Sequence, residues 1–152
     1  MTETATANLA TTGGLPAGLR VTTLAGMIPV EFLEPGDRVV TRSGARTLRR
    51  VEVTVARDLP VVRVAPDTLG SGRPDAEIVL PADQPIVLSD WRAKVLYGTP
   101  RALVAAGRLA DGEFIRADRV AELRIYRLVF DQPQVIYAEG LELVAAPAPA
   151  LV

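Results

Sequence analysis

Short apolar runs separated by turn-forming residues fill most of the chain and leave little length for helices. The clearest run is Thr47–Arg57, in which Val51, Val53 and Val55 alternate with polar or small residues, as in a half-buried strand. Glu34–Asp37 (Glu-Pro-Gly-Asp) is a strong turn signal, because proline presets φ at its second position and glycine accepts a positive φ at its third. Many short strands at close spacing favour an all-β fold arranged as a sandwich, a barrel or a horseshoe.

The remaining elements are assigned from the same signals. Further strands are expected over Leu19–Leu24, Arg38–Thr41, Val61–Ala65, Glu77–Leu80, Ile86–Leu88, Lys94–Tyr97, Val120–Phe130, Val135–Ala138 and Leu141–Val144. Asp58–Pro60 should interrupt the chain between two strands, and the two prolines of Pro81–Pro85 favour a turn or a sheet edge. Arg101–Leu109 is the only segment that reads as a helix, and Pro29–Leu33 suits a single helical turn because proline is favoured at a first helical position.

The length and the two ends indicate one domain with flexible termini. At 152 residues the chain is long enough to bury a core. Met1–Gly14 is small and polar, lacks the basic cluster of a secretory signal, and is expected to be a flexible arm. Ala145–Val152 alternates alanine with proline and is expected to be a flexible tail. The predicted domain is therefore Leu15–Val144.

Two absences exclude a large share of enzyme chemistry, because the chain contains no cysteine and no histidine. It therefore has no thiolate nucleophile, no zinc–thiolate site and no side chain that normally titrates near neutral pH. The sequence also has no Gly-rich phosphate loop and no carboxylate cluster at metal-ligand spacing. We therefore expect no cofactor and no bound metal.

The charge balance argues against nucleic acid as a partner. The formal net charge is −1, whereas a nucleic-acid-binding surface normally shows a basic excess. No run approaches the roughly 18 apolar residues of a transmembrane helix. We therefore expect a soluble chain without membrane insertion, placed in the cytoplasm in preference to secretion. The sequence leaves the compartment, the oligomeric state and the identity of any protein partner open.

Five segments, in order and at compatible spacings, resemble the bacterial Hint domains, which are relatives of the hedgehog autoprocessing domain and of inteins. The most specific is Val30–Val39 (Val-Glu-Phe-Leu-Glu-Pro-Gly-Asp-Arg-Val), which is similar to the family signature Val-Glu-x-Leu-x-x-Gly-Asp-x-Val. The other four segments are Ala17–Thr23, Trp91–Ala93, Ala102–Gly112 and Leu128–Gly140. The resemblance spans residues 14–144 and implies a Hint-type β-horseshoe of many short strands with one short helix.

The same resemblance implies a self-cleavage chemistry whose residues are missing here. In Hint domains the thiol or hydroxyl of the first residue attacks the preceding carbonyl, and a Thr/Ser-x-x-His motif polarises that carbonyl and protonates the leaving nitrogen. The resemblance places the nucleophile at Gly14, the motif's hydroxyl at Pro81, its histidine at Gln84, and a further histidine at Pro133. Asp131 is a candidate vestigial site residue, although a turn residue is the simpler interpretation.

Three hypotheses for the function follow. The first is a degenerate, non-catalytic Hint-like domain that acts as a protein-binding or structural module. The second is residual self-processing, with Thr11 or Thr12 as the nucleophile. The third is a small-ligand pocket inside the β-fold, lined by Trp91, Tyr97 and Tyr126. Considered by itself, Trp91 is more typical of a core anchor than of a ligand platform.

Overall fold

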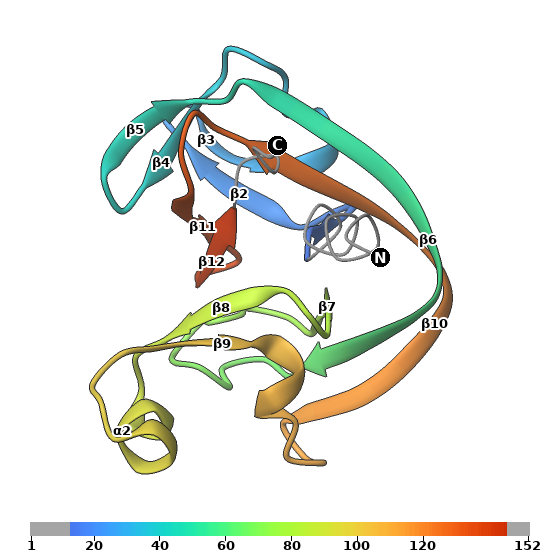
Figure 1. Ribbon diagram of the computed structural model, residues 1–152, viewed down its shortest axis with the longest axis vertical. Coiled ribbons are helices and arrows are strands. Elements are labelled where there is room, and N and C mark those ends of the chain that lie inside the picture. The colour runs from blue at the N-terminus through green and yellow to red at the C-terminus, as the bar shows by residue number, and fades with distance from the viewer. Residues whose placement is uncertain (1–12, 146–152) are drawn as a thin grey trace, which may run out of the picture.

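Two antiparallel β-sheets build the fold in the computed structural model, which describes residues 13–145 (Figure 1). The smaller sheet has the order β1 (Leu15–Pro16), β10 (Ile115–Val129), β6 (Arg50–Val64) and β7 (Ile78–Pro81). The larger sheet has the order β3 (Gly26–Pro29), β2 (Arg20–Thr23), β4 (Arg38–Thr41), β11 (Gln134–Ala138), β12 (Leu141–Ala145), β8 (Pro85–Leu88) and β9 (Ala102–Ala105). The remaining strand, β5 (Gly44–Thr47), pairs with β4. The predicted all-β fold class is confirmed.

A long ribbon of β6 and β10 forms the back of a horseshoe (Figure 1). The two 15-residue strands pair from Arg50 opposite Val129 to Val64 opposite Ile115. The predicted interruption at Asp58–Pro60 is therefore wrong. Asp58 has a φ of +51°, yet the register is the same on both sides of it, because a partner strand of equal length holds the chain through the distortion. One half of the horseshoe holds β2–β5 and β11, and the other half holds β7–β9 (Figure 1).

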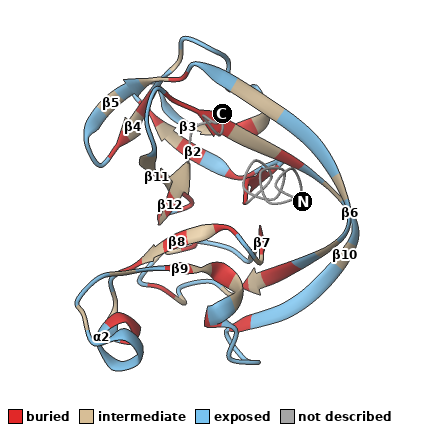
Figure 2. Cartoon of the chain, viewed as in Figure 1, coloured by how far each residue is buried: buried red, intermediate tan, exposed pale blue. Residues whose placement is uncertain are grey.

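The hydrophobic core lies in the two halves of the horseshoe, and the middle of the ribbon is mostly exposed (Figure 2). The largest fully buried apolar side chains are Leu48, Leu80, Ile86, Leu88, Ile115, Ile125, Ile136, Leu141 and Leu143. Because β12 lies between β8 and β11, its buried residues join the two halves into one core.

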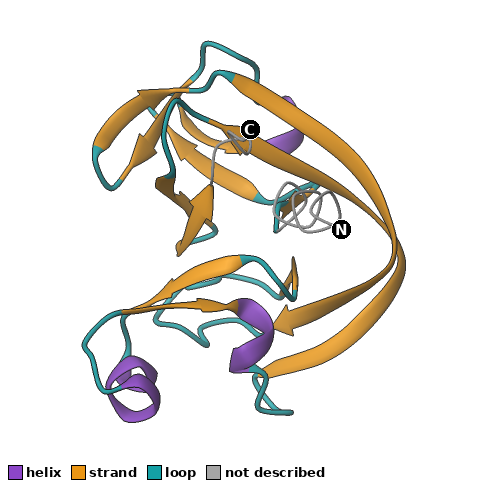
Figure 3. Ribbon diagram, viewed as in Figure 1, coloured by secondary structure: helices purple, strands orange, loops and turns teal. Residues whose placement is uncertain are grey.

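The α-helix lies where a strand was predicted. Helix α2 spans Trp91–Tyr97, whereas the predicted helix Arg101–Leu109 is strand β9 followed by the 3-10 turn η2 (Ala106–Leu109) (Figure 3). The alanine-rich stretch 102–105 favours a helix by propensity, but it pairs along its whole length with β8, and this pairing decides. Within residues 13–145, no helix is long and apolar enough to cross a membrane.

Helix α2 is short but capped at both ends. The Asp90 side chain accepts a hydrogen bond from the Arg92 N–H at 3.0 Å, and Gly98 ends the helix in the left-handed conformation with a φ of +72°. These two caps enclose the seven residues of the helix and are visible in the sequence. The predicted strand Lys94–Tyr97 is therefore wrong, because the two caps outweigh the strand propensity of Val95 and Tyr97.

Local turn chemistry gave correct predictions. The 3-10 turn η1 (Val30–Phe32) occupies the predicted helical turn, and β4 has the predicted bounds. The turn Glu34–Asp37 is closed by the Asp37 N–H, which donates to the Glu34 carbonyl at 3.1 Å, and Gly36 has a φ of +98°. Pro81–Pro85 contains a turn, as predicted. However, β8 begins at Pro85 and lies inside the larger sheet, not at its edge.

Candidate functional site

The candidate site is built around the turn between β7 and β8. Pro81 ends β7 opposite Val61, and the Gln84 N–H donates to the Pro81 carbonyl at 3.0 Å, which closes a four-residue turn. The 3-10 turn η2 covers this turn: the Ala106 N–H donates to the Gln84 carbonyl at 2.9 Å and the Gly107 N–H donates to the Ala82 carbonyl at 2.8 Å. The backbone on both sides of Gln84 is therefore fixed by hydrogen bonds.

The Gln84 side chain connects the two ends of the described chain. It is 2% exposed, and its Oε1 accepts a hydrogen bond from the Gly14 N–H at 2.7 Å. Its Nε2 donates to the Pro85 carbonyl at 2.7 Å and to the Val144 carbonyl at 3.0 Å. Both N–H donors and the oxygen of the amide are therefore engaged. Gly14 immediately precedes β1 and Val144 lies in β12, so this buried amide joins the beginning and the end of the domain.

The two glycines at the site leave no space for a side chain. Gly13 and Gly14 are buried and have φ values of +71° and +123°, a region that L side chains rarely adopt. A Cβ at Gly14 would lie 2.1 Å from Cγ2 of Ile125, and a Cβ at Gly13 would lie 2.6 Å from Oε1 of Gln84. Both glycines fell within the predicted flexible arm, but the Gly13 N–H donates to Oδ1 of Asp83 at 3.2 Å and the Gly14 N–H is bound by Gln84.

A half-buried arginine of β10 lies beside these glycines. The Nη1 of Arg127 donates to Oγ1 of Thr54 at 3.2 Å, and Cγ of Arg127 would be 3.5 Å from a Cβ at Gly14. Burial lowers the pKa of Arg127, while the negative charges of Glu52 and Asp83 act in the opposite direction. The guanidinium cannot accept a proton from a nucleophile, because it remains charged in proteins.

Asp131 and Pro133 lie in the turn between β10 and β11. Asp131 accepts hydrogen bonds from Nε and Nη2 of Arg49 at 3.0 and 2.9 Å, and the hydrogen bond to Arg49 lowers the pKa of this exposed carboxylate. Asp131 and Pro133 line an open depression of about 590 Å³ together with Arg42, Ser43 and Arg46. Neither Gly14 nor Gln84 lines this depression, so the structure does not bring the four resemblance-derived positions and Asp131 into one site.

The three aromatic residues predicted to line a ligand pocket do not converge. Trp91 and Tyr97 are exposed on α2, at one corner of the molecule, whereas Tyr126 lies on the ribbon beside Leu15 of β1 (Figure 1). The prediction of Trp91 as a core anchor is also wrong, since this side chain is 64% exposed and packs over the Arg92 guanidinium, 4.8 Å from the ring centroid.

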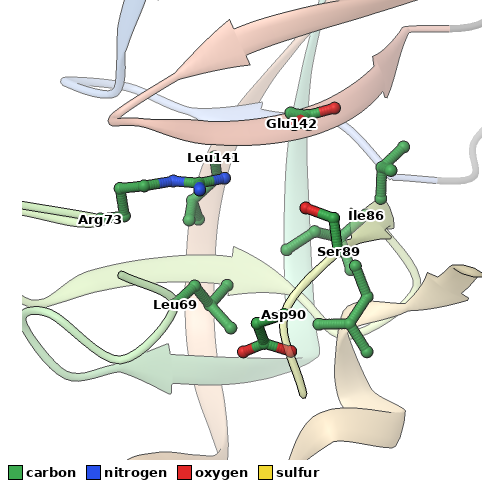
Figure 4. A pocket seen from close by; sticks show the side chains of 9 residues that line it. Leu69, Arg73, Ile86, Ser89, Asp90, Leu141 and Glu142 are labelled. Carbon is green, nitrogen blue, oxygen red and sulfur yellow. The ribbon is translucent and has the colours of Figure 1, made fainter. Parts of the chain in front are cut away.

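The pocket in Figure 4 lies elsewhere and is small. It is lined by Leu69, Arg73, Ile86, Val87, Leu88, Ser89, Asp90, Leu141 and Glu142. Its free volume of about 10 Å³ is the room of about one water molecule, which is far too little for a metabolite. None of the three predicted aromatic residues lines it. Within residues 13–145, no three carboxylates gather closely enough to hold a metal ion.

Sequence reasoning missed Ile125, Gly13 and Val144 as parts of the site. Ile125 comes near Gly14 because β1 pairs with β10, with Leu15 opposite Tyr126 and Pro16 opposite Ile125. No local signal in the sequence specifies this register, because Gly14 and Ile125 are far apart along the chain. The candidate nucleophiles Thr11 and Thr12 lie outside the described residues.

The larger sheet and the smaller sheet, whose β6–β10 ribbon forms the back, define a horseshoe-shaped all-β domain. Gly14 and Val144, near the two ends of the described chain, both bind the Gln84 side chain. The family model described as Hint domain matches residues 14–144, and the chain therefore belongs to the Hint-domain family, as the sequence predicted. No curated protein sequence matches the chain significantly.

Solved structures of inteins and intein-like domains share the fold. The solution structure of a bacterial intein-like domain from Clostridium thermocellum is similar with a TM-score of 0.61 at 15% identity, covering 88% of this chain and 97% of that one. A variant of the Ssp DnaB mini-intein gives a TM-score of 0.63 at 10% identity, covering 92% and 98%. A DnaB intein from Synechocystis sp. gives 0.55 at 12% identity, covering 88% and 99%.

Proposed function

We propose that this chain is a Hint domain that does not cleave itself and serves as a protein-binding or structural module. The observation that carries the proposal is the closed environment of Gly14, the position that the family resemblance assigns to the nucleophile. This residue has no side chain, Cγ2 of Ile125 occupies the place of a Cβ, and its N–H is bound to a buried amide. The groups that remain at this site hold the chain ends together.

The chemistry of acyl transfer supports the same proposal. An acyl shift needs a hydroxyl or thiol against the preceding carbonyl, a donor to the developing oxyanion and an acid for the leaving nitrogen. Glutamine cannot transfer a proton near neutral pH, and both N–H groups of Gln84 already donate to carbonyls of Pro85 and Val144. Pro81 has no hydroxyl, and its carbonyl accepts the hydrogen bond that closes the turn.

The intact mass of the purified chain tests the proposal. We expect the full chain, with or without its initiator methionine, and no change after incubation with excess thiol or hydroxylamine, which cleave esters and thioesters. Cleavage before Gly14 would release residues 1–13, and residual self-processing at Thr11 or Thr12 would release a peptide of ten or eleven residues. Any of these fragments, if abolished by Thr11→Val and Thr12→Val or by Gln84→Leu, would contradict the proposal.

Helix α2 supports the protein-binding part of the proposal. Four of its seven residues are large apolar side chains that are exposed, with Trp91 at 64%, Val95 at 70%, Leu96 at 58% and Tyr97 at 37%. The helix is held to the domain by its first turn, through Arg92 and Ala93. Exposed aromatic and aliphatic residues on a rigid, capped element are typical of a surface that a protein partner covers.

Replacing an exposed leucine of α2 should leave the domain stable. We expect Leu96→Gln to change the free energy of unfolding by less than about 0.5 kcal/mol, because the side chain contributes little to the core. The matched control Leu109→Gln alters a leucine that is 6% exposed in η2, and should cost about 3 kcal/mol. Urea denaturation of both variants measures the difference. Equal losses would show that α2 packs as part of the core.

A further inference from the structure

Within residues 13–145, the two outer edges of the ribbon have no neighbouring strand along its middle. On the β6 side, β7 pairs only with Val61–Val64, so within the described chain no strand lies beside Arg50–Leu59. On the β10 side, β1 pairs only with Ile125 and Tyr126. Figure 2 shows the middle of the ribbon as largely exposed. An uncovered strand edge presents unpaired N–H and C=O groups and is a template for pairing with another strand.

The two edges differ in the feature that normally prevents such pairing. The β10 edge carries charges at Arg116, Asp118, Arg119, Glu122 and Arg124. The β6 edge is charged at Arg50, Glu52, Arg57 and Asp58, but its stretch Val53–Ala56 (Val-Thr-Val-Ala) is the longest uncharged run in the uncovered part of either strand. Charged side chains on an edge strand oppose pairing with another chain, whereas a β-branched, uncharged stretch favours it. The stretch Val53–Ala56 is therefore the least protected part of the two edges.

From this contrast we infer that a second copy of this chain pairs with the β6 edge, antiparallel and around a two-fold axis at Thr54. The inference goes beyond the proposed function, because it makes no assumption about cleavage. A two-fold pairing of one strand with itself presents the same patch on both copies, and the opposing side chains must point to the same face of the sheet. The axis must therefore pass at a residue, and Val53, Thr54 and Val55 are the central choices.

Charge complementarity selects Thr54 among these three. With the axis at Thr54, Val53 lies opposite Val55 of the second copy, and Arg50 lies opposite Asp58 of the second copy, an attractive pair. Placing the axis at Val55 would set Glu52 opposite Asp58 of the second copy, and two carboxylates repel each other. An axis at Val53 would set Arg50 opposite the uncharged Ala56 and would lose the attractive pair.

The side chains that this register uses are accessible. Val53 and Val55 are 50% and 38% exposed, and the side chains of Arg50 and Asp58 are 52% and 80% exposed. In the single chain Arg50 pairs with Glu52 at 2.9 Å and Asp58 with Arg119 at 3.1 Å, so both ion pairs are at the surface. Asp58 has a positive φ, so the regular pairing covers about the stretch from Val51 to Arg57, and the Arg50–Asp58 pairs flank it at both ends. An interface this short predicts a weak dimer.

Single-cysteine variants test the register, because the native chain contains no cysteine. Directly opposite residues have Cβ atoms about 4.5–5.5 Å apart, a separation that a small movement converts to disulfide geometry. Under mild oxidation we expect Thr54→Cys to form a disulfide-linked dimer at least about tenfold faster than Ala56→Cys on the same strand. Ala121→Cys, on the charged β10 edge, is the second control and should be equally slow. Circular dichroism verifies that each variant is folded.

Sedimentation equilibrium of the cysteine-free chain tests the pairing without a crosslink. We expect the fraction of dimer to rise with protein concentration up to about 1 mM. In Val55→Lys, which places a charge opposite Val53 of the second copy, the association constant should fall at least about tenfold. Equal oxidation rates at the three cysteine positions, or a native chain that stays monomeric over this range, would overturn the inference.

Discussion

Gly14→Ala is expected to lower the free energy of unfolding by about 3 kcal/mol, the largest effect of any methyl-sized change at the site. Two physical terms add. The φ of +123° is unfavourable for any residue with a Cβ, and the new methyl group would lie 2.1 Å from Cγ2 of Ile125, which is itself 2% exposed. Ile125 lies in a paired strand, so it cannot move away without disturbing the β1–β10 register.

Gly18→Ala is the matched control for this prediction. Gly18 has a φ of +93°, but nothing lies within 4 Å of its Cβ position, so the variant carries only the backbone term, about 1 kcal/mol. Urea denaturation of both variants separates overlap from backbone strain. In a double-mutant cycle, Gly14→Ala should cost less in an Ile125→Ala background than alone, since the truncated side chain no longer meets the methyl group. Equal losses for Gly14→Ala and Gly18→Ala would mean that Ile125 does not close the site.

This prediction bears on attempts to restore cleavage. Introducing Gly14→Cys and Gln84→His supplies a thiol and an imidazole. However, the cysteine side chain would overlap Ile125, whose Cγ2 occupies the position of its Cβ. Replacing Gln84 also removes the amide that donates to the carbonyls of Pro85 and Val144. Under the proposed function, restoring these two side chains is therefore not enough to restore cleavage, because the backbone conformation of Gly14 and the Ile125 side chain of β10 leave no space for a nucleophile.

Gln84→Leu is expected to lower the free energy of unfolding by about 3 kcal/mol, because a buried donor and two carbonyls lose their partners while the volume stays similar. The groups left without this partner are the Gly14 N–H and the carbonyls of Pro85 and Val144. The effect should be concentrated where the chain ends meet. Hydrogen exchange should therefore show a loss of protection at the Gly14 amide that exceeds the loss in the ribbon.

Gln134→Leu is the control for Gln84→Leu. Oε1 of Gln134 accepts a hydrogen bond from Oγ of Ser43 at 2.8 Å at the exposed surface, where water replaces the lost partner. Its cost should stay below about 1 kcal/mol. Chemical denaturation compares the two variants directly. If Gln84→Leu proves as mild as Gln134→Leu, the buried amide is not what holds the two chain ends.

The parts of the fold that could be predicted are those set by local chemistry. Pro29 immediately precedes the 3-10 turn Val30–Phe32, Gly36 adopts the positive φ that its turn requires, and Arg38–Thr41 is a strand with the expected bounds. Prediction failed where residue propensity was outweighed, by a neighbouring strand in one case and by helix caps in the other. The alanine-rich segment 102–105 is a strand because β8 lies beside it, and Trp91–Tyr97 is a helix because Asp90 and Gly98 cap it.

The candidate site shows the same division. The resemblance pointed to Gly14 and Gln84, and these residues, 70 positions apart in the chain, are joined by a hydrogen bond of 2.7 Å. It also pointed to Pro133, which lies beside Asp131 in a different depression. The predicted aromatic pocket failed because a sequence gives no direction for a side chain. Trp91 and Tyr97 are exposed on a helix of which only the part Lys94–Tyr97 is predicted, as a strand.

The sequence by itself determined the alternation of short strands and turns, the Hint family, and the absence of any thiol or imidazole, since these are properties of composition and of neighbouring residues. Only the tertiary structure decided how much room surrounds Gly14, that the Gln84 amide joins Gly14 to β12, and that within residues 13–145 no strand lies beside the middle of the ribbon. The reason is physical: space, hydrogen-bond partners and edge exposure depend on the register of strands distant in the chain, and many contacts together set that register.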